Sequence, residues 1–315
     1  MESKIIRLQF NNFKSIRELL KAFSTEKKCE NFLKDVRWGK EVKSPYDENA
    51  KVYKCSRNRY RCANTGKDFN VRTGTMFENS KVELRTWFLA IYIITSHKKG
   101  ISSLQLSKDL HITQKSAWFM LERIRKCFNI ENYHILDNNV EIDETYIGGK
   151  NKNRHKNKRI ENSQGRSTKD KTPVLGMLER NGKLTALTVK DVTAPTLTKE
   201  IIQTIKKSAT LNTDEWLGYK GITNLYKHTV VKHGQGEYVN GIAYTNNIEC
   251  FWSILKRGIF GIYHFASKKH LQDYIDEFVF RYNTRDYEVS ERFVTLLSNM
   301  TVRTRYKDLK VAGVN

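Results

Sequence analysis

The chain has 315 residues, of which 39% are hydrophobic and 11% aromatic, enough for a substantial core in about two domains. Its 56 Lys and Arg against 34 Asp and Glu give a formal net charge of +22, which is typical of a protein that binds a polyanion, either nucleic acid or an acidic membrane surface. No signal-peptide pattern and no apolar run of 18 residues occur, which excludes a membrane-spanning protein, and we expect a cytoplasmic protein with reduced cysteines.

Residues 1–80 are predicted to form a small module of short antiparallel strands. The segment 52–77, VYKCSRNRYRCANTGKDFNVRTGTMF, alternates aromatic and polar residues as such strands do. A zinc ribbon needs two Cys-x-x-Cys pairs, but the corresponding positions here are Ser44, Asp47, Cys62 and Thr65. Hydroxyl groups are poor zinc ligands. We therefore expect a degenerate zinc-ribbon-like module without structural zinc, the alternative being that Cys29 or Cys55 rebuilds a site.

Residues 81–130 are predicted to be helical. The segment 82–100 has a dense apolar stripe and should end at Gly100. Two helices follow, with Ser102 and Thr113 as their N-caps. This spacing is typical of a helix-turn-helix, and the basic charge favours that interpretation over an ordinary helical hairpin. The second helix would then face DNA through its first turn, at Thr113, Gln114, Lys115 and Ser116.

Residues 135–300 are predicted to form one α/β domain, followed by a tail at 301–315. A strand at 140–147, a hairpin at 172–190 that turns at Asn181-Gly182, and a helix at 196–208 come first. A strand ending at Asp214, a short helix, a strand at 228–233 and two further helices follow. The order β-β-β-α-β-α-β-α resembles the ribonuclease H-like fold, a mixed sheet flanked by helices.

A basic loop follows the first of these strands. Between Lys150 and Lys171 it holds nine Lys or Arg against two acids, so we expect it to lie along a polyanion or to stay mobile. Its first cations are candidate DNA contacts: Lys150, Lys152 and Arg154.

Three acids fall where this fold would bring them together. Asp143 lies on the first strand and Asp214 ends the fourth, which should be its neighbour, while Glu249 lies on the helix after the fifth strand. Carboxylates drawn together repel one another unless cations neutralise them, and hard oxygen ligands suit Mg²⁺ or Mn²⁺. Glu144 and Glu215 are competing acids, although the strand period should turn Glu144 away and Glu215 should cap the following helix.

A cation lies on the same predicted helix as Glu249. Lys256 follows it by seven residues, two helical turns, with Trp252 and Ser253 between them. Lys256 and its neighbour Arg257 are therefore candidates for holding the DNA backbone or the cleaved phosphate. The alternative interpretation is a solvated helix face, with Trp252 packed in the core.

Several stretches resemble a known family. From about residue 50 to residue 285 the chain is similar to insertion-sequence transposases of the IS1595 type with an ISXO2-like catalytic domain, most clearly at VEIDETYIGGK, TDEWLGYKG and YTNNIECFWSILKRGIFG. The resemblance implies a DDE-type transposase in which Asp143 and Asp214 are the first two catalytic acids. The 34 residues between Asp214 and Glu249 also resemble DDE recombinase spacing. Some relatives use Asn as the third residue, which leaves Asn246 and Asn247 as alternatives to Glu249.

This resemblance implies a function. We expect binding to terminal inverted repeats of double-stranded DNA and Mg²⁺- or Mn²⁺-dependent cleavage followed by strand transfer, by a homodimer or larger assembly in the bacterial cytoplasm at the nucleoid. Two departures from the family pattern are the lost Cys pairs and Tyr244, which stands where a His is usual. The alternatives are a DNA-binding protein that has lost catalysis and a ribonuclease H-like nuclease without strand transfer.

Overall fold

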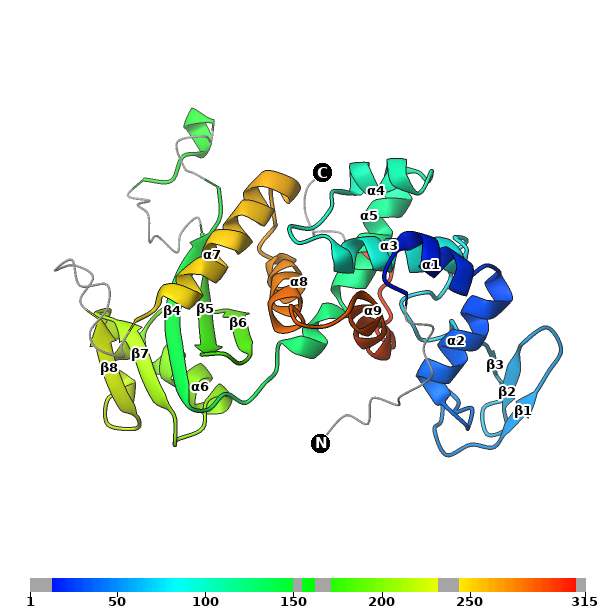
Figure 1. Ribbon diagram of the computed structural model, residues 1–315, viewed down its shortest axis with the longest axis horizontal. Coiled ribbons are helices and arrows are strands. Elements are labelled where there is room, and N and C mark those ends of the chain that lie inside the picture. Colours follow the sequence, from blue (N-terminus) through cyan, green and yellow to red (C-terminus); the bar gives the residue numbers. More distant parts are fainter. Residues whose placement is uncertain (1–12, 150–154, 162–170, 232–243, 310–315) are drawn as a thin grey trace. The chain divides into compact units, whose positions relative to one another are not determined.

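The computed structural model describes residues 13–149, 155–161, 171–231 and 244–309. The chain divides into two compact units, of which the first comprises residues 1–127 and 286–315 and the second residues 128–285 (Figure 1). No helix among the described residues is long and apolar enough to cross a membrane.

The first unit is mainly helical. Its core is an aromatic cluster in which the rings of Phe23 and Phe88 lie 4.8 Å apart and those of Phe88 and Phe293 5.3 Å apart, both edge to face. The helices of this unit are α1 (Ile16–Ala22), α2 (Glu26–Trp38), α3 (Leu84–Ser96), α4 (Ser103–Asp109), α5 (Gln114–Arg125), α9 (Val289–Ser298) and α10 (Tyr306–Leu309). Helices α1 and α2 were not predicted.

Helix α9 belongs to a different unit from the one that the sequence predicted. The sequence analysis placed it in the α/β domain at 135–300, but it belongs to the first unit. The reason is Phe293, which is fully buried against the rings of Phe13, Phe23, Phe32 and Phe88. Residues 301–309, expected to be a tail, include α10 and also belong to this unit.

The strands expected in 52–77 are present as β1 (Val52–Lys54), β2 (Tyr60–Cys62) and β3 (Asp68–Phe69), an antiparallel sheet in the order β1-β2-β3. Tyr60 and Phe69 are buried there and stack on each other. The hydroxyls of Ser44 and Thr65 bond to the sulfur of Cys62 and lower the pKa of this thiol. Three of the four positions where a zinc ribbon would have ligands are thus joined by hydrogen bonds.

Helices α4 and α5 begin where the sequence predicts. The hydroxyl of Ser102 accepts the N–H of Gln105 at 3.1 Å, and that of Thr113 accepts the N–H of Ser116 at 3.2 Å. Leu104, an apolar residue in the first turn of α4, is 57% exposed. The second half of α5 is buried, and only its first turn is open to solvent.

The second unit contains a five-stranded mixed sheet in the order β6-β5-β4-β7-β8. Strand β5 runs antiparallel to both β4 and β6, whereas β4, β7 and β8 run parallel. Asn181 makes the β5–β6 turn in the left-handed conformation, with φ of 58°. The strands are β4 (Asn139–Ile147), β5 (Thr172–Glu179), β6 (Leu184–Thr188), β7 (Thr210–Asp214) and β8 (Lys227–Val231).

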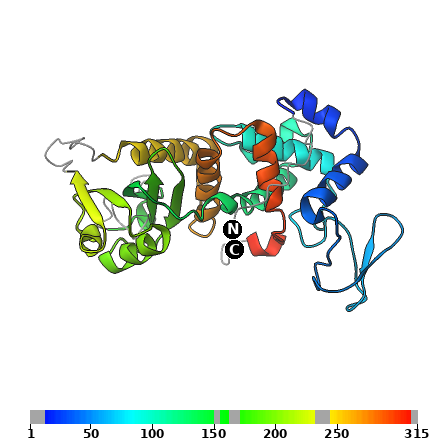
Figure 2. The ribbon, with the colours of Figure 1, turned by 60° about the horizontal axis from the view of Figure 1, so that its bottom comes forward.

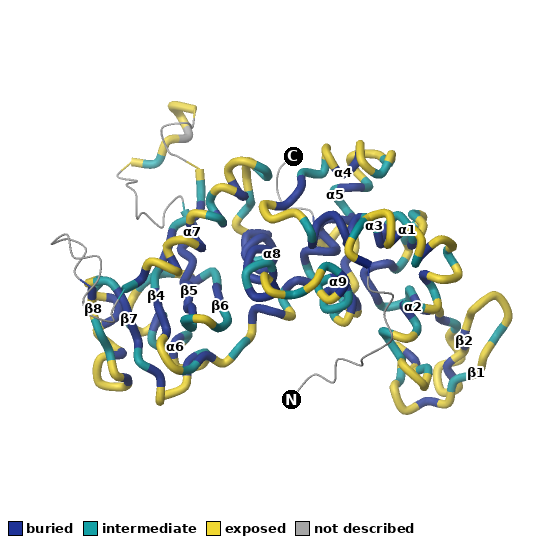
Figure 3. The backbone as a smooth tube through the Cα atoms, viewed as in Figure 1, coloured by how far each residue is buried: buried dark blue, intermediate teal, exposed yellow. Residues whose placement is uncertain are grey.

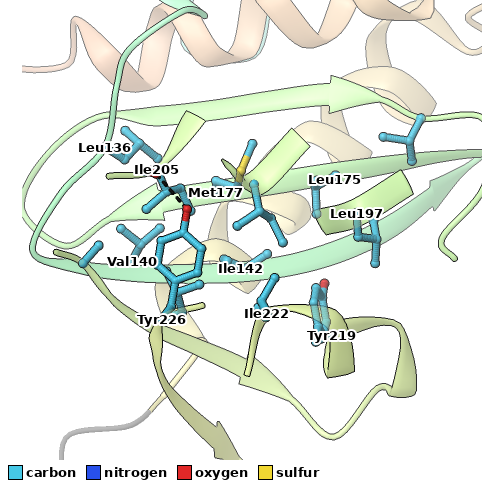
Figure 4. Close-up of a cluster of buried hydrophobic side chains, with 14 residues drawn as sticks. Leu136, Val140, Ile142, Leu175, Met177, Leu197, Ile205, Tyr219, Ile222 and Tyr226 are labelled. Atoms are coloured by element: carbon cyan, nitrogen blue, oxygen red, sulfur yellow. Dashed lines mark hydrogen bonds between the residues drawn. The ribbon is translucent and has the colours of Figure 1, made fainter. Parts of the chain in front are cut away.

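Helices cover both faces of this sheet (Figure 2). Helix α6 (Ala194–Thr204) and the 3₁₀ helix η4 (Leu217–Ile222) pack on one face, where a cluster that includes Ile142, Met177 and Tyr219 is buried (Figure 4). Helices α7 (Asn246–Gly258) and α8 (Leu271–Asn283) pack on the other face around Val174, Trp252 and Phe278. Because both faces are covered, β4 and β5 are buried along nearly their whole length (Figure 3).

Candidate active site

A pocket of about 950 Å³ lies in the second unit where β4 and β7 meet α7. Asp143 lies on β4, and Asp214 is the last residue of its parallel neighbour β7. Parallel strands bring their carboxyl ends to one edge of the sheet, which is where such sheets usually bind ligands. The pocket is lined by Asp143, Glu144, Thr145, Asp214, Glu215, Trp216, Leu217, Thr245, Glu249, Trp252, Ser253 and Lys256.

Helix α7 supplies the opposite wall of this pocket. Glu249 lies in its first turn and is exposed, and the hydroxyl of Thr245 donates to its Oε1 at 3.4 Å. Trp252, Ser253 and Lys256 follow at helical spacing on the same face. The pocket therefore brings together the three acids and the lysine named from the sequence, Asp143, Asp214, Glu249 and Lys256.

Asp143 is an acid of this pocket with a strongly raised pKa. Burial, followed by the charges of Glu144 and Asp214, raises its pKa from 3.8 to about 7. The indole Nε1 of Trp252 donates to its Oδ2 at 3.0 Å and partly opposes that rise. A divalent cation that bound this carboxylate would displace its proton to solvent.

Trp252 reaches Asp143 because β5 has a glycine opposite. Gly176 pairs with Asp143 across the β4–β5 ladder. A Cβ at Gly176 would lie 2.5 Å from Cζ2 of Trp252, so any other residue would displace the indole. The sequence contained this signal as a glycine inside a strand, but its partner could not be read from the pattern.

The two competing acids lie differently. Glu144 points to the other face of the sheet, as the strand period predicts, and its Oε2 accepts the hydroxyl of buried Tyr219 at 2.8 Å. Glu215 is exposed and lines the pocket. The turn after β7 is held by Asp214, whose Oδ1 accepts the N–H of Trp216 at 3.0 Å. Glu215 was expected to cap the following helix, but the N-cap of η4 is Trp216.

Sequence reasoning missed Glu141, two residues before Asp143 and fully buried. Its Oε2 accepts the backbone N–H groups of Asn247 and Ile248 at 3.0 and 3.2 Å, and its Oε1 accepts the Asn247 amide at 2.9 Å. Arg180 completes the network with a 2.8 Å ion pair to Glu141 and a bond to the carbonyl of Tyr244. Glu141 thereby fixes the N-terminus of the helix that carries Glu249.

This network bears on the third acid. The side chain of Asn247 is bound to Glu141, and neither Asn246 nor Asn247 lines the pocket, whereas Glu249 does. The oxygen donors available to a divalent cation in this pocket are thus the carboxylates of Asp143, Asp214 and Glu249, with Glu144 and Glu215 beside them. Such a hard, anionic set fits Mg²⁺ or Mn²⁺.

The residues expected to contact DNA are only partly described. Lys150, Lys152 and Arg154 lie outside the described residues. Arg257 is exposed on α7, and its Nε donates to the carbonyl of Ser253 at 3.1 Å. In the first unit, Gln114 donates to the hydroxyl of Ser103 at 2.8 Å, and Lys115 lies 5.2 Å from the ring centroid of Tyr306.

Together, the mixed sheet and the acid-lined pocket, at the carboxyl end of β7 and beside the middle of β4, define an α/β domain with an anionic site. Residues 135–283, which contain this site, match the model of the ISXO2-like transposase domain. An uncharacterized protein in transposable element ISH50 of Halobacterium salinarum is 29% identical over 275 residues, which cover 83% of this chain and 92% of that protein.

Solved structures of Mos1 transposase were also found. A pre-cleavage Mos1 transpososome shares 11% identity over 92% of this chain and 97% of that chain, with a TM-score of 0.26. A Mos1 transposase paired-end complex with the left transposon end shares 13% identity over 90% and 96%, with a TM-score of 0.27. Scores of this size do not establish a shared fold.

Proposed function

We propose that the chain is a DDE-type transposase that binds the ends of its insertion sequence and catalyses divalent-cation-dependent cleavage and strand transfer. The observation that carries the proposal is the pocket lined by Asp143, Asp214 and Glu249, inside a domain of the transposase family. The order of the sheet, β6-β5-β4-β7-β8 with only β5 reversed against its neighbours β4 and β6, fits the ribonuclease H-like fold expected from the sequence.

The three acids would hold Mg²⁺ or Mn²⁺, which supplies Lewis-acid activation of the attacking oxygen and charge stabilisation at the cleaved phosphodiester. The fit rests on the raised pKa of Asp143, because a carboxyl destabilised by burial and by neighbouring negative charge gains most from a cation. Trp252 orients Asp143 through its 3.0 Å bond, and Glu141 orients the helix that carries Glu249.

Lys256 supplies the positive charge of the site. It is half-buried in the same pocket, and burial lowers its pKa, while the nearby charge of Asp143 opposes that change. An ammonium group in this position can hold a phosphate oxygen of the bound strand. Its role is to fix the DNA backbone against the acids, so that the attacking oxygen and the phosphorus stay in line.

The first unit would supply DNA recognition. Helices α4 and α5 are joined by a tight turn with His111 at a φ of 50°, and the first turn of α5 presents Thr113, Gln114 and Lys115 to solvent. A helix-turn-helix reads the major groove with these positions. Joining two ends requires at least a homodimer, and we expect the protein to act on DNA in the bacterial cytoplasm.

The N-terminal module should fold without zinc. The hydroxyls of Ser44 and Thr65 bond to Cys62, and the sheet around them has its own core of Tyr60 and Phe69. Elemental analysis of protein purified without chelator should find less than one zinc per chain. One zinc per chain, released by a chelator with loss of structure, would contradict this expectation.

An assay on labelled duplexes from the DNA that flanks the encoding gene tests the proposed function. The wild-type protein in Mg²⁺ should nick these duplexes and join the freed 3′ ends to a target plasmid. Salt-sensitive binding without nicking would instead identify a protein that has lost catalysis. Nicking without joined products would identify a nuclease. Either outcome would replace the proposal.

A further inference from the structure

A second pocket lies in the same unit, next to the candidate active site. It has a volume of about 380 Å³, and its walls come from residues 147–149 at the end of β4 and from the segment 259–266 that continues α7. Gly149 borders open space, since a Cβ there would meet no atom within 4 Å. Nothing in the proposed cleavage chemistry uses this pocket.

Two elements connect this pocket to the acids. On β4, Asp143 and Ile147 lie on the same face of the strand, four residues or about 13 Å apart. On the helix, Lys256 lines the first pocket and Phe260, one turn later, lines the second. Nucleotides adjacent to a phosphate held at Asp143 and Lys256 would therefore reach the second pocket.

The pocket presents aromatic rings that the fold leaves uncovered. Phe265 is 68% exposed and Phe260 46% exposed, above a floor of buried Ile147 and Ile259. The backbone is irregular here, since a π-helical turn at Ile259–Tyr263 ends at His264 with φ of 61°. Such turns and left-handed non-glycine residues are often found at functional sites.

The charge around the pocket favours a nucleotide over an apolar peptide or a second copy of the chain. None of the described residues that line it is acidic. Lys256 and Arg257 precede its aromatic segment, and Lys268 and Lys269 follow it. Exposed rings flanked by cations are the combination with which proteins bind unpaired nucleotides, the rings stacking on bases and the cations tracking phosphates.

We propose that this pocket receives one unstacked nucleobase of the DNA strand beside the cleaved phosphate, with Phe265 and Phe260 stacking on the base. The inference rests on the proposed function and adds how the DNA is held. A base withdrawn into the pocket would fix the register of the strand, so that one phosphate lies against the acids.

The test uses end duplexes that carry 2-aminopurine at one position at a time around the cleavage site. They are bound to the full-length Asp143→Asn protein in Mg²⁺, so no cleavage is needed. One position should gain fluorescence on binding, and Phe265→Ala should remove most of that gain. Gly261→Ala is the matched control on the same π-helical turn, because a Cβ at Gly261 meets no atom within 4 Å. No gain at any position, or an equal gain with Phe265→Ala, would overturn the proposal.

Cleavage by protein with an intact Asp143 provides the second readout. Phe265→Ala should slow nicking of the normal duplex by roughly tenfold, and Phe265→Trp should restore it, since stacking needs a ring. On a duplex that lacks the base at the identified position, the wild-type protein and Phe265→Ala should nick at equal rates. A slow rate that persists on that duplex would overturn the inference.

The two proposals fail separately. A fluorescence gain without nicking by the wild-type protein would refute the cleavage function but leave the base pocket. Nicking without any fluorescence gain would support the cleavage function and refute the binding of a base in the second pocket. Concentration-dependent dimerisation that is lost in Phe265→Ala, with no fluorescence gain, would assign the pocket to a second copy and overturn the inference.

Discussion

The carboxylate of Glu141 accepts two hydrogen bonds from Asn247, one from its backbone N–H at 3.0 Å and one from its side-chain amide at 2.9 Å. This pair joins the strand that carries Asp143 to the helix that carries Glu249. The relative position of the first and third acids therefore depends on a residue that does not line the pocket.

Replacing Glu141 should uncouple the helix from the strand. Glu141→Ala leaves Arg180, whose side chain is 12% exposed, without its carboxylate and should cost about 3–5 kcal/mol of unfolding free energy. Glu141→Gln keeps one acceptor oxygen, which can still accept the backbone N–H of Asn247, but its NH2 group replaces the second acceptor. It should be milder than the alanine variant in urea unfolding but still slow nicking, with DNA affinity unchanged. A loss below about 1 kcal/mol for the alanine variant would show that the network is not structural.

Gly176→Ala tests the space that Trp252 occupies. The added Cβ overlaps the indole and should move it off Asp143, at a cost of about 1–3 kcal/mol from overpacking. Nicking should fall while DNA binding is kept. Gly261→Ala is the control. Unchanged nicking and stability in Gly176→Ala would mean that the indole bond has no role.

The pKa of Asp143 predicts how stability depends on pH. Because this pKa rises from 3.8 to about 7 on folding, the folded chain keeps a proton that the unfolded chain releases between those values. Stability without divalent cations should therefore fall as pH rises from 3.8 to about 7. Asp143→Asn, which can still accept from Trp252, should have a higher Tm than the wild type at pH 8 in EDTA and a similar Tm at pH 4.

At pH 8, adding Mg²⁺ should give the wild-type protein a higher Tm than Asp143→Asn. Mg²⁺ must displace the proton of Asp143, so its apparent affinity should rise about tenfold per pH unit below pH 7 and level off above it. Asp143→Asn should show no such rise. Calorimetry that finds pH-independent Mg²⁺ binding by the wild type would contradict the assignment of Asp143 as a ligand.

Lys115 tests the DNA-reading helix. It is exposed in the first turn of α5, so Lys115→Ala should leave the fold intact and reduce the slope of log affinity against log salt by about 1. The matched control is Lys207→Ala, at an exposed lysine in the loop before β7. Equal slopes for the Lys115→Ala and wild-type proteins on end DNA would contradict the proposal that α5 contacts DNA as part of a helix-turn-helix.

The sequence predicted those features that depend on local patterns. Asn181-Gly182 marked the β5–β6 hairpin, and Ser102 and Thr113 marked two helix starts. The position of Asp143 and Asp214 on adjacent strands followed from the resemblance of the element order to the ribonuclease H-like fold. Each of these signals needs only neighbouring residues or the order of elements along the chain.

Features that depend on distant contacts were missed. Phe293 joins α9 to the aromatic core of the first unit through Phe23 and Phe88, residues from the other end of the chain. Glu141 looked like one more acid on a strand until its partners on α7 were known. Gly176 could be understood only beside Trp252. Contacts between residues this far apart in the sequence leave no local pattern from which they could be predicted.

The most direct test of the central claim is single-turnover nicking of end DNA in Mg²⁺ by four variants. Asp143→Asn, Asp214→Asn and Glu249→Gln should each abolish nicking and retain DNA affinity, whereas Glu215→Gln, at an exposed acid of the same pocket, should keep it. Nicking by any of the first three at the wild-type rate would contradict the assignment of the three acids.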